Sequence, residues 1–397
     1  MRSISTPAPD GSRSAAGRTF WIVTGTVVTV ALGIGFTGLI LQAGTGGGVG
    51  VGPMRTLAAR TVIITKPVTS LNVESYGANI RVTGKPVGQV TVSESISYAP
   101  AQGGPPAVTH RDIRGLLTLA APACANINCS VAFTVTVPSG VTVSAAADGG
   151  AVTVSGTGAA DLDSGGGPAV ATAISGPLNI TAGGGSVWAS GAPTAAIDSG
   201  GGPVTVARIA GDLTVHAEGG GVSVTSAGTS DLDSGGGPVT AIGIRGPLTV
   251  TAGGGGVNVS SAPGANIDSG GGPVTATQIN GPLTVTADGG GIEVDGVTGT
   301  LNANTGGGPL NATGLTSQTA TVSADGGGVT LEFVTVPAAL MVTTGGGPAV
   351  LAVPNSVYSL NVDTGGGPES VAITTNPAAA NAINVSTDGG AAQIGPA

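Results

Sequence analysis

The chain has 397 residues and a formal net charge of −9, with 40% hydrophobic, 2% aromatic and only 8% charged residues. Beyond Arg114, seventeen acidic residues face two basic ones, Arg208 and Arg245. An acidic body of this kind repels phosphate backbones, which excludes nucleic acid as a partner. The 74 glycines are periodic and alternate with β-branched residues, which favours an all-β fold over disorder.

Residues 1–18 are predicted to form a cytoplasmic tail and residues 19–42 a transmembrane helix. Arg2, Arg13 and Arg18 lie in the tail, whereas no charged residue occurs from position 19 to position 44. About 20 apolar residues at ~1.5 Å each cross the ~30 Å hydrocarbon core, and basic residues ahead of a span keep the N-terminus inside. We therefore expect a single-pass cell-membrane protein with residues 55–397 extracytoplasmic. A cleaved signal peptide is the alternative, and cleavage stays open.

Residues 43–60 form a glycine-rich linker, and residues 61–140 an irregular capping segment. The capping segment holds five stretches rich in β-branched residues, interrupted by Pro67, by Gly84 to Pro86 and by a Gly/Pro-rich loop at 99–108. Terminal units of a repeat array are atypical. We therefore expect these strands to form the first, degenerate turns of the array that follows.

Cys124 and Cys129 are the only cysteines of the chain. Two cysteines outside the cytoplasm favour a disulfide, although so short a loop gives modest stabilisation. Free thiols are the alternative. A metal site would need more ligands, and His110 and His216 are the only histidines. We predict no metal and no other cofactor.

Residues 141–397 form a repeat array built on the sequence DSGGGPVT. Asp163, Asp198, Asp233 and Asp268 each open a copy, 35 residues apart, and a related glycine cluster lies between successive copies. Glycine clusters therefore return about every 18 residues, a period typical of a solenoid. The array predicts an all-β parallel β-solenoid with ~18-residue glycine-rich turns.

Each turn is predicted to contain two short strands, with one corner at the glycine triplet and another near Gly211 or Gly281. Alternate residues of a strand point the same way, so Val206, Leu213, Val250 and Leu283 should face a thin apolar core. A β-propeller usually has a longer repeat with aromatic signatures. An antiparallel meander does not explain why every second turn is a glycine triplet.

The four aspartates before the triplets are predicted to be structural corner carboxylates. At a given position they occur only on every second turn, separated by residues such as Thr181 and Thr251. This spacing reduces repulsion between stacked carboxylates. We expect Asp163, Asp198, Asp233 and Asp268 to accept hydrogen bonds from the corner backbone. A calcium column is the alternative, but the nonapeptide spacing of calcium-binding β-rolls is missing.

An apolar N-terminal span, the stretch SLNVESYGANIRVTG at 70–84 and the serial [DST]-x-G-G-G-x-V turns resemble the bacterial "toastrack" putative adhesins. The resemblance covers residues 60–397, with GGG-Pro-Val in place of the more usual Ser-Gly-Asp-Val. It implies an extracytoplasmic β-solenoid of the type associated with cell-envelope stress sensing and adhesion, and it implies no catalytic residues.

Polysaccharide-cleaving β-helices need carboxylates clustered with Arg, Lys or His. Here Arg208 and Arg245 lie 37 residues apart, out of phase with the period of 35. We therefore expect no enzymatic activity. The predicted function is that of a membrane-anchored, adhesin-like or envelope-sensing ectodomain whose envelope or surface partner is unknown. A structural cell-wall spacer is the alternative.

Overall fold

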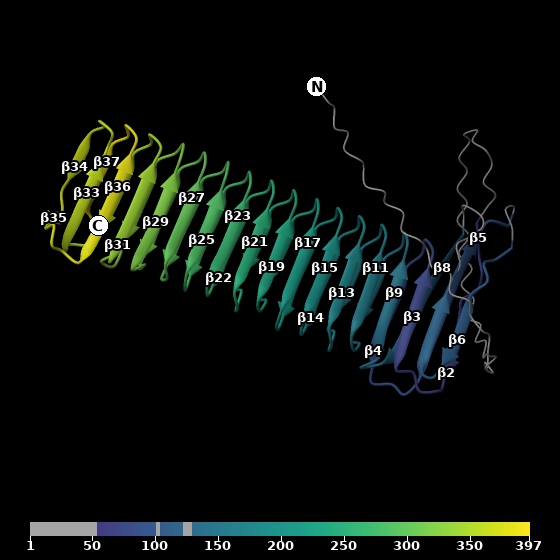
Figure 1. Ribbon diagram of the computed structural model, residues 1–397. Helices are drawn as coiled ribbons and strands as arrows, with labels where there is room; N and C mark the ends of the chain where they lie inside the picture. Colours follow the sequence, from purple (N-terminus) through teal and green to yellow (C-terminus); the bar gives the residue numbers. More distant parts are fainter. Residues whose placement is uncertain (1–53, 101–103, 122–128) are drawn as a thin grey trace, which may run out of the picture.

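The computed structural model describes residues 54–100, 104–121 and 129–397, which form an elongated stack of strands (Figure 1). The chain winds between two sheets, A and B, as a parallel β-solenoid of about 13 turns, which confirms the predicted fold class. The predicted transmembrane segment 19–42 lies outside the described residues. Within those residues, no helix is long and apolar enough to cross a membrane.

Sheet A begins with two strands that pair with β5 and continues as a single row. In spatial order its strands are β1 (Arg55–Thr56), β2 (Arg60–Ile64), β5 (Val90–Tyr98), β8 (Cys129–Pro138), β4 (Ile80–Lys85), β10 (Val152–Ser155), β12 (Ala169–Thr172), β14 (Val187–Ala192), β16 (Val204–Ile209), β18 (Val222–Thr225), β20 (Val239–Ile242), β22 (Val257–Ala262), β24 (Val274–Ile279), β26 (Ile292–Val297), β28 (Leu310–Leu315), β30 (Val329–Phe333), β32 (Ala349–Val353), β37 (Ala392–Pro396) and β34 (Glu369–Val371).

Sheet B runs alongside sheet A, and from β9 to β32 each of its strands is followed by a strand of sheet A through a corner. In spatial order its strands are β6 (Thr109–Ile113), β7 (Leu116–Ala120), β3 (Ser70–Ser75), β9 (Thr142–Ala147), β11 (Ala160–Ser164), β13 (Leu178–Ala182), β15 (Ala195–Ser199), β17 (Leu213–Ala217), β19 (Ser230–Ser234), β21 (Leu248–Ala252), β23 (Ala265–Ser269), β25 (Leu283–Ala287), β27 (Leu301–Thr305), β29 (Thr319–Ala324), β31 (Ala339–Thr344), β36 (Asn381–Thr387), β33 (Val357–Asp363) and β35 (Thr374–Thr375).

The core is the thin apolar layer between the two sheets. Val206, Leu213, Val250 and Leu283 are each at most 1% exposed, which confirms their predicted inward orientation. The strands of sheet B repeat the burial pattern of alternating buried and exposed residues, as a strand with one apolar face must. One side of each sheet is therefore left for solvent or for a partner.

The glycine triplets form the corners that lead from sheet B to sheet A. In triplets that follow Ser, Thr or Ala, a Cβ on the first or third glycine, such as Gly183 or Gly185, would overlap the backbone of the previous turn. The middle glycine, Gly184, has no atom within 4 Å of that position. In the triplets that follow Glu218, Asp288 and Asp325, the overlap falls on the middle glycine instead. The triplets are therefore needed for close stacking of the turns. From Gly165 to Gly328 their φ angles are not positive, whereas Gly346, Gly365 and Gly366 near the C-terminal end have positive φ.

The opposite corner, from sheet A back to sheet B, has a left-handed residue in each turn from β10 to β28. Glycine occupies this place in some turns, and larger residues occupy it in others. The column of positive φ contains Gly156, Ala173, Gly191, Arg208, Ser226, Gly243, Ser261, Gln278, Gly296 and Gly314. From β10 to β28, positive φ occurs at this corner and not at the glycine triplets.

At both ends of the stack, the order in space differs from the order along the chain. Strand β3 lies between β7 and β9, and β36 lies between β31 and β33. Antiparallel pairs also occur at this end, of β5 with β1, β2 and β8 and of β6 with β7, and β1 lies within the segment 43–60 that was predicted to be a linker. The capping segment is therefore more than a set of degenerate turns, because antiparallel strands cover the N-terminal end of the regular stack.

Candidate binding surface

Between β11 and β25, the outward side of sheet B carries six of the seventeen carboxylates of the repeat array. In each of the five-residue strands β11, β15, β19 and β23, the first, third and fifth residues are buried, and the second and fourth face outward. We call the outward side of sheet B, from β11 to β25, the acidic face. Its carboxylates are Asp161, Asp163, Asp198, Asp231, Asp233 and Asp268.

The strand register aligns these residues into a column with regular spacing. Asp163 pairs with Thr181 of the next turn, and Thr181 pairs with Asp198. The same alternation continues through Asp233 and Asp268. Turns are ~4.8 Å apart, so neighbouring carboxylates of this column are separated by about 10 Å. This distance weakens their repulsion in water and leaves the face strongly acidic without crowding.

A single basic group lies within the acidic face. The His216 Nδ1 atom is 3.0 Å from Asp233 Oδ2, and both side chains are about half exposed. The register also places His216 beside Asp198 on its other side. The imidazole therefore lies between two carboxylates, and one of the two contacts it directly.

The polar groups that bind the glycine corners lie one residue after the predicted aspartates. Ser234 Oγ lies 2.8 Å from the carbonyl oxygen of Gly237 in its own corner and 3.3 Å from that of Gly220 in the previous turn. Its hydroxyl proton can be donated to either. Equivalent hydroxyls, all facing inward and donating to their own corner, are Ser164, Ser199, Ser269, Thr305, Thr344 and Thr387.

The four predicted corner carboxylates thus lie within strands and point outward. Within the described part of the chain, the hydrogen bond found for them joins Asp233 to His216, and none joins them to a corner amide. The physical reason is the period of two. Leu162 and Ser164 share one side of β11, so Asp163 must face solvent. The alternation itself was the signal that could have identified the serines.

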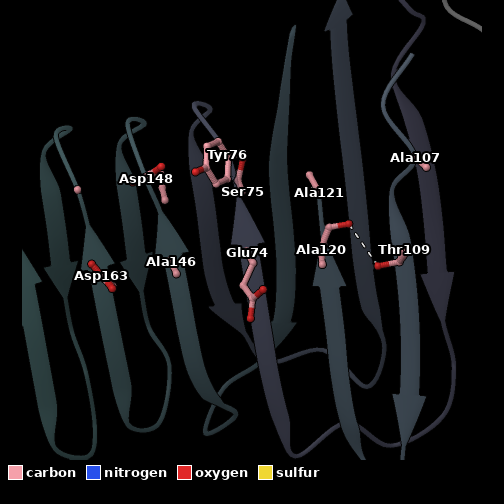
Figure 2. A pocket seen from close by; sticks show the side chains of 12 residues that line it. Glu74, Ser75, Tyr76, Ala107, Thr109, Ala120, Ala121, Ala146, Asp148 and Asp163 are labelled. Carbon is pink, nitrogen blue, oxygen red and sulfur yellow. Dashed lines mark hydrogen bonds between the residues drawn. The ribbon is translucent and has the colours of Figure 1, made fainter. Parts of the chain in front are cut away.

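A groove opens at the N-terminal end of the acidic face (Figure 2). It has a volume of about 600 Å³. The register places Glu74 between Ala120 and Ala146, and Ala146 beside Asp163. Small alanine side chains between longer acidic ones produce the hollow. Its lining is Glu74, Ser75, Tyr76, Ala107, Thr109, Ala120, Ala121, Ala146, Ala147, Asp148, Asp163 and Gly165, with no basic residue.

The outward side of sheet A differs in chemistry. Trp188 is 47% exposed and pairs with Val170 and Thr205 on the neighbouring strands. Glu293 and Asp295 of β26 are exposed, and Thr313 donates a hydrogen bond of 3.2 Å to Asp295 Oδ1. This side carries a lone aromatic side chain and fewer carboxylates than the acidic face.

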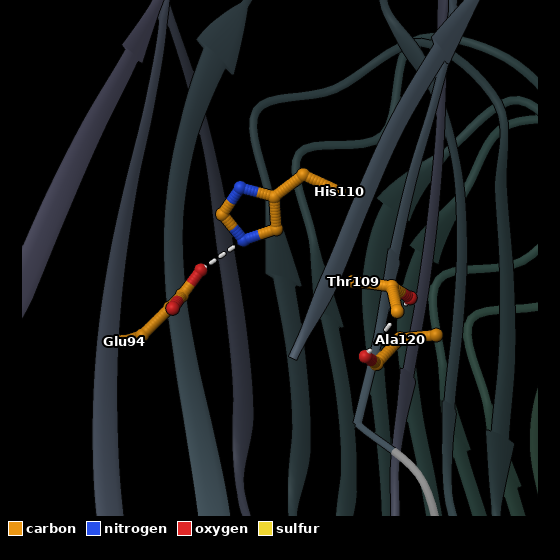
Figure 3. Close-up of polar contacts among 4 residues, drawn as sticks. All are labelled: Glu94, Thr109, His110 and Ala120. Carbon is orange, nitrogen blue, oxygen red and sulfur yellow. Dashed lines mark hydrogen bonds and ion pairs between the residues drawn. The ribbon is translucent and has the colours of Figure 1, made fainter. Parts of the chain in front are cut away.

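The capping segment contains a buried acid–base pair, Glu94 with His110 (Figure 3). The Glu94 side chain is 1% exposed and the His110 side chain 11% exposed, and the imidazole contacts the carboxylate through Nε2. Within the described residues, no hydroxyl or thiol hydrogen-bonds to His110. The pair therefore lacks a nucleophile and joins β5 to β6 inside the cap.

The other predicted groups are partly outside the described residues. Cys129 begins β8, whereas Cys124 lies outside the described residues, so their disulfide stays a prediction. Among the described residues, no group of three or more His, Cys, Asp or Glu side chains is arranged to hold a metal ion. Arg208 and Arg245, which the sequence placed out of phase, contact Ser190 Oγ and the carbonyl oxygen of Ile209, respectively.

No protein-family model and no curated protein matches the chain. Similar solved structures include a "putative adhesin" from Parabacteroides distasonis, with 9% identity and a TM-score of 0.24 over 84% of this chain and 97% of that one. Another is a "putative adhesin" from Parabacteroides merdae, with 13% identity and a TM-score of 0.20 over 74% and 96%. A third is a "putative cell adhesion protein" from Clostridium sporogenes, with 9% identity and a TM-score of 0.17 over 86% and 100%.

The three descriptions name adhesins or cell adhesion, the class that the sequence resembles. At these identities and TM-scores, the likeness is a resemblance only. The function proposed below depends on the arrangement of this chain's own residues.

Proposed function

We propose that the protein is a non-enzymatic, membrane-anchored surface module that binds a positively charged envelope or cell-surface partner. The observation that carries this proposal is the gathering of six aspartates on one side of sheet B, beside an acidic groove. A face lined by one sign of charge attracts an oppositely charged partner and raises the rate of encounter.

The stacked turns suit this role because they hold the charges at fixed spacing. Each carboxylate of the column is fixed by a parallel strand pair on either side, so the face loses little conformational freedom on binding. About 13 turns at ~4.8 Å per turn extend the solenoid by about 60 Å. With residues 19–42 as a membrane anchor, this length would carry the acidic face away from the lipid surface.

The same length also fits the alternative role of a spacer without a specific ligand. A spacer requires only reach, so its function would not depend on which side carries the charges. The two roles are therefore separated by altering the charges on one side while the number of turns stays constant.

Attachment of intact cells that display the full-length chain to beads coated with a lysine-rich peptide tests the proposal. The variant Asp198→Asn, Asp233→Asn, Asp268→Asn removes three charges from the acidic face and keeps the side-chain shape. We expect it to lose most of the attachment, and we expect salt to weaken attachment of the unaltered chain.

The matched control is Glu293→Gln, Asp295→Asn, Glu332→Gln, which removes the same number of charges from the outward side of sheet A. It should attach like the unaltered chain. Equal loss in both triple variants would mean that net charge alone matters, and no loss in either would favour the spacer. Both results would contradict the proposed binding face.

A further inference from the structure

The C-terminal end of the solenoid exposes an unpaired sheet edge. Strand β34 pairs with β37 on one side and has no strand on the other among the described residues. In sheet B, β35 pairs only with Val357 and Tyr358, which leaves the rest of β33 without an outer neighbour. An open edge of this kind is a template for pairing with another chain.

The inward-facing apolar side chains of this last turn are only partly buried. Leu360, Val362 and Ile373 are half-buried and pack against the core, and Val371 is 37% exposed. The corresponding residues of inner turns, such as Leu351 and Ile394 in the column of Val371, are 1% exposed. The end of the stack thus presents the apolar layer that the inner turns bury.

Glu369 breaks this apolar layer at its edge. Glu369 pairs with Ala392 on the neighbouring strand, and Ala392 pairs with Ala349 on the next one. Glu369 therefore continues a column of inward-facing residues, one from each strand of sheet A. From Phe133 to Ala392, every member of the column is apolar and at most 3% exposed. The column contains Phe133, Ile80, Val152, Ala169, Val187, Val204, Val222, Val239, Val257, Val274, Ile292, Leu310, Val329, Ala349 and Ala392 before it ends at Glu369.

A second copy that paired along β34 would enclose Glu369 between two turns. Burial of a carboxylate is unfavourable unless a cation pairs with it. The chain has no basic residue after Arg245, so the same end of another copy offers no partner charge. Inward-pointing charges and short edge strands are devices that keep sheet edges from associating, and β34 has three residues whereas β37 has five.

We propose that the C-terminal edge is a latent interface for a second copy of this chain and that Glu369 keeps it from forming. Two such ends would meet as equivalent surfaces around a two-fold axis. Each chain has one C-terminal end, so the product of releasing the block is a dimer and not a fibre.

The test measures the protein mass of the full-length chain in detergent micelles by light scattering. The unaltered chain should be monomeric, and Glu369→Val and Glu369→Ala should double the protein mass. Alanine already occupies this column at Ala349 and Ala392, so the second variant is compatible with the fold. Adding Val371→Asp to Glu369→Val should restore the monomer, because a charge then returns to the same edge.

Glu293→Val is the matched control, because it makes the same change on the outward side of sheet A and should stay monomeric. Monomeric Glu369→Val and Glu369→Ala with unchanged circular dichroism would overturn the proposal. Equal dimerisation of Glu293→Val, or a mass of Glu369→Val that Val371→Asp does not reduce, would overturn it as well.

Discussion

At the scale of single residues, two neighbours in the DSGGG sequence have opposite environments. Asp233 points to solvent and contacts His216, whereas Ser234 is fully buried and donates to corner carbonyl oxygens. The sequence predicted that the aspartate accepts hydrogen bonds from the corner amides. The structure instead has the serine one residue later donating to the corner, because the corner presents carbonyl oxygens, which need a donor.

This difference predicts unequal effects of two substitutions. Ser234→Ala removes the hydroxyl that serves two turns and should lower the free energy of unfolding by about 1 kcal/mol. Alanine fits there, because Ala217 and Ala252 occupy the same column in adjacent turns. Asp233→Asn should change stability by less than about 0.5 kcal/mol, since an exposed amide still accepts from His216. Urea unfolding of both variants measures this, and a larger loss for Asp233→Asn would refute the assignment.

Tyr358, in the last turn of the solenoid, should make the folding stability depend on pH. Its side chain is fully buried, and its hydroxyl donates to the Pro354 carbonyl oxygen at 2.7 Å. Burial raises the pKa of Tyr358 above the ordinary value of 10.0. Above that value the unfolded chain loses this proton before the folded chain does, so folding stability should fall as pH rises from about 10 toward the folded pKa.

Below pH 10, Tyr358 should contribute no pH dependence. Tyr358→Phe keeps the ring and removes the ionisable group, so it should abolish this part of the alkaline loss. The measurement is the difference in thermal midpoint between the two proteins across the alkaline range. A difference that does not change with pH would contradict a buried, neutral Tyr358.

At the scale of the turn, the sequence was informative because the same chemistry recurs. Alternating valines, leucines and alanines determine the inward face, and the glycine triplets mark the close approach of successive turns. The order of turns at the two ends could not be predicted in this way. Turns with nearly the same inward residues can stack in either order, so nothing local places β36 between β31 and β33.

The triplet corners give a prediction with an internal control. Gly185→Ala places a Cβ against the backbone of Gly167, so the turns must separate, at a cost of about 1–3 kcal/mol. Gly184→Ala, one residue earlier, meets open space and should change stability by less than about 0.5 kcal/mol. Thermal unfolding compares the two, and equal losses would show that the triplets serve another purpose than close stacking.

At the scale of the whole molecule, the solenoid presents two sides of different chemistry to its surroundings. The acidic face of sheet B carries regularly spaced carboxylates, and the outward side of sheet A carries hydroxyls and a lone exposed indole. The sequence revealed the acidic composition, whereas the strand bounds show that Asp161 and Asp231 lie on the outward side together with the four repeat aspartates.

The most direct test of the account is site-specific photo-crosslinking on intact cells that display the full-length chain. One crosslinker replaces Thr251 on the acidic face, and another replaces Thr225, an exposed threonine on the outward side of sheet A. The account predicts that position 251 captures a basic surface partner and that position 225 does not. Equal capture from both positions, or capture from position 225 alone, would contradict the claim that the protein binds through sheet B.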